Sequence, residues 1–188
     1  MRLFIAIELP DSIKQGITRV QEQLKRPGAN AGWTRPEGIH LTLKFLGEVP
    51  DAKVTEIMQA LDGAVRGTGR FQLAVAGAGA FPNAKVPRVL WIGVGGNVDQ
   101  LGTLQNAVEA AMEKTGFERE ARKFSPHLTL ARVGERARPD ERQSLGELIA
   151  GISFEKTYVI DVTSVDLVRS QLTRDGAIYT RLNSIKLK

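Results

Sequence analysis

The sequence of 188 residues contains no cysteine. Disulfides, zinc–thiolate sites, cysteine-ligated iron–sulfur clusters and thiol nucleophiles are therefore excluded. A chain without cysteine suits a reducing compartment, and we expect a cytoplasmic protein. Histidine is also scarce, because the whole sequence has only two.

Long apolar runs are missing as well, since none approaches the ~20 residues that a membrane-spanning helix needs. We therefore expect no membrane partner. The short apolar run at residues 3–7 is followed by Glu8 and Asp11, which predicts a first strand rather than a signal peptide. Hydrophobic residues make up 42% and charged residues 25% of the chain. These fractions are typical of a soluble globular protein and exclude a disordered chain, a collagen or a coiled coil.

The charge balance is mildly basic, with 26 Lys and Arg against 21 Asp and Glu and a net charge of +5. An excess of this sign is compatible with a polyanionic partner that is bound through its phosphates. The excess is spread along the chain without a basic tail, so the simpler interpretation is a mildly basic soluble protein.

Both histidines open the same tetrapeptide, His-Leu-Thr-Leu, at His40 and at His127. A Gly-Glu pair follows each tetrapeptide at the same distance, at residues 47–48 and 134–135. The two copies are 87 residues apart, which is nearly half the chain. This spacing indicates an internal duplication.

The same offset relates other segments of the chain. Strand-like residues 3–7 fall on residues 90–94, and the helix-like residues 51–65 fall on residues 138–152. We therefore predict one domain built from two repeats, at about residues 1–87 and 88–174, with a closing strand at residues 177–187.

Spacings of three and four between apolar residues predict helices, and alternation predicts strands. The alternating strands favour an α+β fold with mainly antiparallel sheets over a doubly wound parallel sheet. The glycine-rich residues 77–87 lack the Lys-Ser/Thr of a phosphate-binding loop and predict a flexible linker between the repeats. The expected elements are strand 2–9, helix 11–25, strand 39–46, helix 51–65, strand 70–76, strand 89–94, helix 98–115, strand 126–133, helix 138–150, strand 157–168 and strand 177–187.

Each tetrapeptide lies in a predicted strand, where residues two apart point to the same face. His40 and Thr42 therefore share one face, as do His127 and Thr129, while the leucines point into the core. Two opposed imidazoles suit acid–base catalysis at phosphorus, because one can take a proton while the other gives one. The two threonine hydroxyls can donate hydrogen bonds to phosphate oxygens.

Two other interpretations of the histidines compete with catalysis. A single histidine on a strand is more often structural than catalytic. A zinc site is a poor fit, because two histidines without cysteine or an acidic ligand pattern are too few ligands. The repetition of both His and Thr at corresponding places favours catalysis over either.

The paired His-x-Thr-x motifs at His40 and His127 resemble those of the 2H phosphoesterase superfamily. The resemblance is closest to its RNA 2′,3′-cyclic phosphodiesterases, which are also called LigT or 2′-5′ RNA ligases. It extends over nearly the whole chain in the right order, through residues 2–7, 40–47, 81–91 and 125–132.

The resemblance implies a bilobal α+β fold, with two pseudo-twofold-related lobes around a central cleft and helices on the outside. It implies hydrolysis of an RNA 2′,3′-cyclic phosphate to a 2′-phosphate without a metal or other cofactor. In that reaction His40 is the proton donor to the leaving 3′ oxygen and His127 is the proton acceptor from water. The expected partner is an RNA or oligonucleotide with this terminus, tRNA fragments included, and we expect a monomer.

Two further residues are candidates for contacts with the substrate. Arg132 matches a basic residue of the family and could neutralise phosphate charge. Strict alternation puts it opposite His127, so it reaches the cleft only through a bulge or at a strand end. Phe4 is a candidate for stacking on a base, although an aromatic residue in a strand more often belongs to the core.

Two rival functions remain open from the sequence. An RNA ligase would run the same chemistry backwards, with a 5′-hydroxyl in place of water and a 2′-5′ bond as its product. Water at ~55 M and the absence of a nucleoside-triphosphate motif favour hydrolysis. A non-enzymatic RNA-binding module would not need two matched histidines, and no aromatic-rich RNA motif is present.

Overall fold

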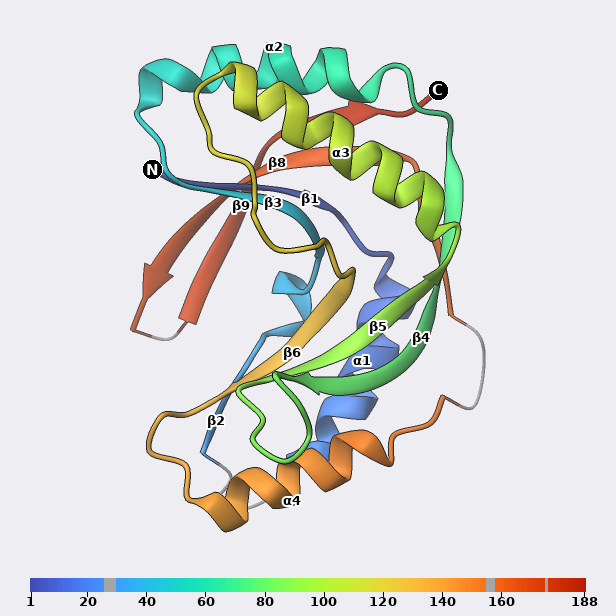
Figure 1. Ribbon diagram of the computed structural model, residues 1–188, viewed down its shortest axis with the longest axis vertical. Helices are drawn as coiled ribbons and strands as arrows, with labels where there is room; N and C mark the ends of the chain where they lie inside the picture. The colour runs from blue at the N-terminus through green and yellow to red at the C-terminus, as the bar shows by residue number, and fades with distance from the viewer. Residues whose placement is uncertain (26–29, 155–157, 175) are drawn as a thin grey trace.

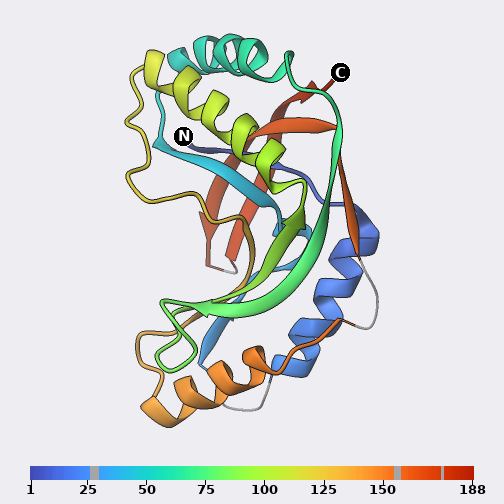
Figure 2. The same ribbon diagram turned by 45° about the vertical axis from the view of Figure 1, so that its right-hand side comes forward.

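A computed structural model describes residues 1–25, 30–154, 158–174 and 176–188. Two antiparallel sheets form its centre (Figures 1 and 2). The first sheet has the strand order β3 (Leu41–Glu48), β1 (Arg2–Ile7), β8 (Ser164–Thr173), β9 (Gly176–Lys186). The second has the order β2 (Ala31–Trp33), β6 (His127–Val133), β5 (Val89–Gly96), β4 (Phe71–Phe81), β7 (Val159–Val162). The expected bilobal α+β architecture is confirmed.

The helices lie on the outside of the two sheets (Figure 1). Helix α3 packs against α2 and β3, and α2 also contacts β9, so this pair covers the first sheet. Helix α1 contacts α4, which packs against β4 of the second sheet. The bounds are α1 (Asp11–Leu24), α2 (Val54–Val65), α3 (Val98–Lys114) and α4 (Pro139–Ala150), with short 3-10 helices η1 (Pro36–Gly38) and η2 (Asp51–Lys53).

Both sheets combine strands from the two halves of the sequence. Strand β4 of the first half pairs with β5 of the second, and β8 of the second half pairs with β1 of the first. The helices cross over in the same sense, because α1 lies with α4 and α3 lies with α2. Neither lobe is therefore formed by one half of the chain alone.

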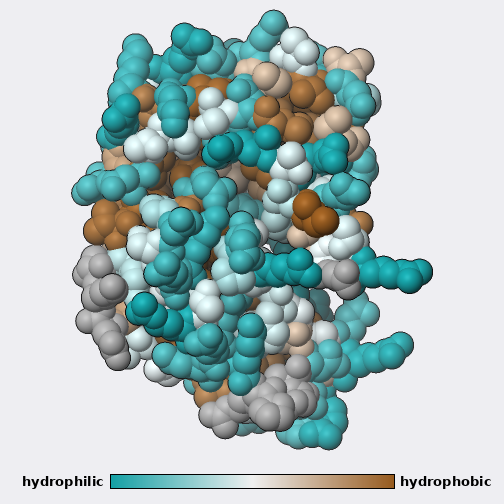
Figure 3. Space-filling view, turned by 180° about the vertical axis from the view of Figure 1, so that it is seen from behind, coloured by the Kyte–Doolittle hydropathy of each residue, from teal (hydrophilic) through white to brown (hydrophobic). Residues whose placement is uncertain are grey.

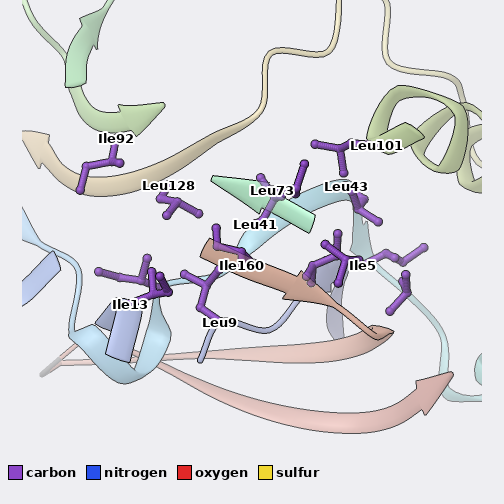
Figure 4. Close-up of a cluster of buried hydrophobic side chains, with 14 of the residues drawn as sticks. Ile5, Leu9, Ile13, Leu41, Leu43, Leu73, Ile92, Leu101, Leu128 and Ile160 are labelled. Atoms are coloured by element: carbon purple, nitrogen blue, oxygen red, sulfur yellow. The ribbon is translucent and has the colours of Figure 1, made fainter. Parts of the chain in front are cut away.

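The motif leucines point into a core that the two sheets share. Leu41, Leu43, Leu128 and Leu130 are all buried and belong to one continuous apolar cluster. Figure 4 shows the first three of these leucines within it. Burial of a leucine side chain contributes about 1.5–3 kcal/mol. The polar partners of these leucines must then point to the other face of each strand.

The predicted linker is wrong over residues 77–81, because β4 continues through them to Phe81. Ala78 pairs with Ile92, and Phe81 pairs with Val89 of β5. Small residues are needed here because the Trp91 ring lies over the strand, and a Cβ at Gly79 would come within 2.6 Å of it. The glycines thus serve close packing rather than flexibility.

Two other elements differ from the expectation. Strand β2 was not predicted, since it has only three residues. The single strand expected at 157–168 is divided, because β7 pairs with β4 and β8 pairs with β1 of the other sheet. Residue 157 lies outside the described residues.

The outer surface carries mostly hydrophilic side chains on the face drawn in Figure 3. None of the helices in the described ranges is long and apolar enough to cross a membrane.

Candidate active site

The two motifs meet in the middle of the molecule. His40 directly precedes β3, and His127 is the first residue of β6. Strands β3 and β6 contact each other, and Figures 1 and 2 both show their beginnings side by side. The structure therefore brings together the two tetrapeptides that are 87 residues apart in the sequence.

A β-bulge interrupts each motif strand at the same place. In β3, Thr42 pairs with Ala6 but Lys44 pairs with Ile5, so Leu43 is the extra residue. In β6, Leu130 is the extra residue, because the pairing steps from Thr129 to Ala131 against consecutive residues of β5. A bulge reverses the alternation of the side chains that follow it.

This reversal places Arg132 on the same face as His127. Leu130 and Ala131 are both buried in succession, and Arg132 is exposed. The bulge that the sequence required for Arg132 to reach the cleft is thus present. In β3 the equivalent reversal brings Phe45 to the face of Thr42, where its side chain is 64% exposed.

The bulge in β3 also turns Lys44 into the protein. Its Nζ donates hydrogen bonds to Glu109 Oε2 at 2.6 Å and to the Glu118 carbonyl at 2.8 Å. Glu109 lies on α3, and its carboxylate also accepts a hydrogen bond from the Glu120 amide. This buried ion pair ties the first motif strand to the segment that leads to His127.

His127 is oriented by a backbone carbonyl two residues earlier. Its Nδ1 lies 2.7 Å from the Ser125 carbonyl oxygen. A carbonyl only accepts hydrogen bonds, so Nδ1 carries the proton and Nε2 remains to react. The edge of the ring packs against Phe81, with 5.0 Å between ring centroids.

His40 lies in an aromatic environment. Its ring stacks on Phe4 at 4.4 Å between centroids, and the Tyr179 ring meets it edge-on at 5.1 Å. Burial lowers the pKa of His40 to about 4, although the charge of Glu8 and a hydrogen bond to the Gly38 backbone oppose this shift. Gly38 is two residues before His40, as Ser125 is before His127, so both imidazoles use the same backbone contact.

Phe4 does not have the exposure that stacking on a base requires. Its side chain is 2% exposed, and the imidazole of His40 covers one of its faces. The base-stacking interpretation of Phe4 is therefore corrected to a packing role beneath His40. The contact of Tyr179 with His40 was not predicted, because nothing in the spacing of the closing strand relates Tyr179 to His40.

Both motif threonines are partly buried on the histidine face. Thr42 pairs across the sheet with Ala6, and Thr129 pairs with Trp91. Within the described ranges, neither hydroxyl has a hydrogen-bond partner in the protein. Both hydroxyls are thus available to a ligand in front of the two strands.

The described residues contain no group of three or more His, Cys, Asp or Glu side chains that could hold a metal ion. The chemical groups at the site are two imidazoles, two hydroxyls and one guanidinium. This set can bind an anion and move protons on both sides of it.

A fold of this kind with two His-x-Thr strands defines a two-histidine phosphoesterase. A family model described as LigT like phosphoesterase matches residues 7–91 and, a second time, residues 92–179. The chain belongs to this family, which confirms the resemblance found in the sequence.

Similar proteins span the full length of the chain. An RNA 2′,3′-cyclic phosphodiesterase of Methanothermobacter thermautotrophicus is 35% identical over 100% of this chain and 99% of its own length. One of Thermotoga maritima is 38% identical over 95% of this chain and 91% of its own length. The crystal structure of E. coli LigT complexed with 3′-AMP superposes with a TM-score of 0.78, at 29% identity over 99% of this chain and 97% of that one.

Proposed function

We propose that this enzyme hydrolyses the 2′,3′-cyclic phosphate at the end of an RNA to a 2′-phosphate, with two histidines as acid and base. The observation that carries the proposal is the convergence of His40-x-Thr42 and His127-x-Thr129 from two strands that belong to different sheets and contact each other. The name shared by the relatives at 35% and 38% identity supports the choice of substrate. A cytoplasmic location and a monomeric state remain predictions from the sequence.

The reaction follows from the roles that the family resemblance implies. His127 Nε2 takes a proton from water as the water oxygen forms a bond to phosphorus. The bond from phosphorus to the 3′ oxygen breaks on the opposite side, and His40 gives its proton to that oxygen. The 2′ ester bond remains, so the product is a 2′-phosphate and a 3′-hydroxyl. The hydrogen bond from Nδ1 of His127 to Ser125 leaves Nε2 free to accept the proton.

The other side chains stabilise charge on the phosphate. The Thr42 and Thr129 hydroxyls donate to its non-bridging oxygens, and Arg132 adds a positive charge on the face of His127. No metal ion is needed in this scheme, because the imidazoles perform both proton transfers.

The low pKa of His40 constrains the donor role. With a pKa of about 4, this imidazole is neutral at pH 7 in the free enzyme. A donor must be protonated, so His40 has to take up a proton when the substrate binds. The negative charge of the phosphate provides the reason, because a nearby anion favours the charged imidazole.

The test is incubation of a short RNA ending in a 2′,3′-cyclic phosphate in excess chelator, followed by identification of the product. We expect a 2′-phosphate, at the same rate with and without chelator. His40→Ala and His127→Ala should each lower kcat by roughly 10²–10⁴-fold. Activity that disappears on chelation and returns with a metal ion would refute the two-histidine mechanism.

A second arm of this test adds an RNA with a 5′-hydroxyl. A 2′-5′ joined product in place of the 2′-phosphate would identify a ligase. Binding of the RNA without any reaction would identify a non-enzymatic RNA-binding module.

A further inference from the structure

The acid and base roles require a difference between two histidines that the repeat makes alike. Each imidazole contacts the backbone two residues earlier, and each shares its face with a threonine. The two sites differ in the residue that lies across the sheet from each histidine. That residue is in a position to decide which imidazole gives the proton.

The strand next to His40 ends in a carboxylate. Strands β1 and β3 pair antiparallel as far as Ile7 and Leu41, and one step further along this register are Glu8 and His40 (Figure 1). The chain neighbours of Glu8, Ile7 and Leu9, are buried in the core, whereas Glu8 is exposed. Its carboxylate is thus on the face of the imidazole, where its charge favours protonated His40.

The corresponding place beside His127 holds no side chain. Gly93 of β5 is the residue that pairs with His127. A Cβ at Gly93 would collide with the carbonyl oxygen of Ala76 in β4, so the second sheet has no room for a carboxylate there. The His127 ring instead contacts the Ser125 carbonyl and the Phe81 ring, neither of which carries a charge.

Lys14 of α1 holds Glu8 in its place. Its Nζ donates one hydrogen bond to Glu8 Oε1 and another, at 3.3 Å, to the Glu37 carbonyl in η1. Glu37 directly precedes Gly38, whose backbone contacts the His40 ring. Lys14 thereby joins the end of β1 to the segment that orients the imidazole. Its positive charge acts on His40 in the opposite sense to the charge of Glu8.

Other charged groups near Glu8 come from β8 and β9. Asp166 of β8 is buried, and its Oδ2 lies 3.8 Å from the guanidinium of Arg181 in β9. Burial raises the pKa of Asp166 and the charge of Glu8 adds to this rise, whereas the charges of Arg181 and Lys186 oppose it. The charges that act on the His40 imidazole itself are those of the ion pair between β1 and α1.

We propose that Glu8 is the positioning residue that makes His40, rather than His127, the proton donor of the reaction. This inference rests on the proposed function. The negative charge of Glu8 stabilises the imidazolium that a donor must be, and it adds to the charge of the bound phosphate. The residue that pairs with His127, a glycine, offers no such charge. The duplication thus supplies two similar imidazoles, and the residue across the sheet assigns their roles.

The experiment measures the pH dependence of kcat with a 2′,3′-cyclic phosphate substrate. The alkaline limb of this profile reports the pKa of the proton donor in the complex. Glu8→Gln should move this limb to lower pH by about 0.5–1 unit, the size expected for an exposed carboxylate with a partner cation. On the alkaline side kcat should then fall about 3- to 10-fold, whereas on the acid side, where His40 is already protonated, it should hardly change.

A second variant, Lys14→Met, separates the effect of charge from that of structure. It removes the opposing cation and should move the limb to higher pH, by up to about 0.5 unit. Both variants break the same ion pair, so a purely structural role would move both limbs in the same direction or lower kcat equally at every pH. Glu8→Asp keeps the charge and should restore most of the shift.

The matched control is an ion pair on the other side of the first sheet. Asp62→Asn removes a carboxylate that pairs with Arg66 on α2, which makes the same change in net charge as Glu8→Gln. Helix α2 covers the sheet face opposite to the histidine, so the limb should stay at its wild-type position. A limb that moves equally in Asp62→Asn would assign the shift to net charge and overturn the inference.

A second measurement needs no turnover. The chain has only two histidines, so the imidazole NMR signals of His40 can be assigned by comparison with His40→Asn. In complex with a 2′-O-methyl nucleoside 3′-methylphosphodiester, which cannot react, the pKa of His40 should fall in Glu8→Gln and rise in Lys14→Met. An unchanged pKa in Glu8→Gln, or shifts of the same sign in both variants, would overturn the inference. Failure of the wild type to hydrolyse the cyclic phosphate would instead refute the proposed function.

Discussion

We predict that His40 takes up a proton when a phosphate ligand binds. In the free enzyme, burial against Phe4 and Tyr179 accompanies a pKa of about 4 for this imidazole. At pH 7, about one molecule in 1000 then carries the proton. When a substrate anion binds next to His40, the imidazole should therefore take up a proton from solution.

The size of the effect follows from Coulomb's law. A negative charge about 4 Å from the imidazolium contributes about 4 kcal/mol at an effective dielectric constant of about 20. Each tenfold change in a protonation equilibrium takes about 1.4 kcal/mol, so this interaction shifts the equilibrium about 1000-fold. Half of the bound enzyme is then protonated at His40 at pH 7, and most of it at pH 6.

The assay is titration calorimetry in two buffers with different enthalpies of ionisation. A suitable ligand is a 2′-O-methyl nucleoside 3′-methylphosphodiester, which cannot be cyclised or ring-opened and has a single negative charge. We expect an uptake of about 0.5 proton per site at pH 7 and about 0.9 at pH 6. His40→Asn keeps a polar side chain of similar reach and should bind without this uptake.

The comparison of the two proteins isolates His40 from every other titrating group. If the wild type and His40→Asn take up the same number of protons, the phosphate does not charge His40. The donor role would then have to pass to another group, and the in-line scheme with His40 on the leaving side would be wrong.

Three further predictions concern stability and binding. Lys44→Met removes the cation that pairs with the buried carboxylate of Glu109, and urea titrations should show a free energy of unfolding that is lower by about 3–5 kcal/mol. The double variant with Glu109→Leu should recover most of this loss. Because the folded state disfavours protonated His40, the free energy of unfolding should be at its full value above about pH 6.5 and should fall by about 2 kcal/mol between pH 7 and pH 5. His40→Asn should abolish this fall. Thr42→Val and Thr129→Val preserve the branched shape and should each lower kcat/KM by roughly 10- to 150-fold without lowering the thermal midpoint, whereas loss of stability at full specific activity would make these hydroxyls structural.

Local patterns in the sequence predicted most of the elements. The helix expected at 98–115 is observed as Val98–Lys114, and the strand expected at 126–133 as His127–Val133. These predictions succeeded because apolar periodicity reports the buried face of an element directly. Residues 77–81 were misassigned, because glycine and alanine indicate a loop unless a neighbouring Trp91 ring is known to need the space.

The sequence by itself determined the composition of the site. The repeated His-x-Thr at His40 and His127 specifies two imidazoles and two hydroxyls on the outer faces of two strands, because alternation is a property of the strand alone. The resemblance to the two-histidine phosphoesterases follows from that repeat. A β-bulge depends on the pairing with the neighbouring strand. The sequence analysis could therefore only say that Arg132 needs a bulge or a strand end to reach the face of His127.

Only the tertiary structure decided which side chains of the two halves lie together. The bulges at Leu43 and Leu130 bring Phe45 and Arg132 to the face of the two motif threonines, and pairing with neighbouring strands defines both bulges. Tyr179 reaches His40 from a strand near the other end of the chain, and the burial that it completes with Phe4 lowers the pKa of the imidazole. Register, burial and contact between distant segments are properties of the packed chain, which no local pattern of residues contains.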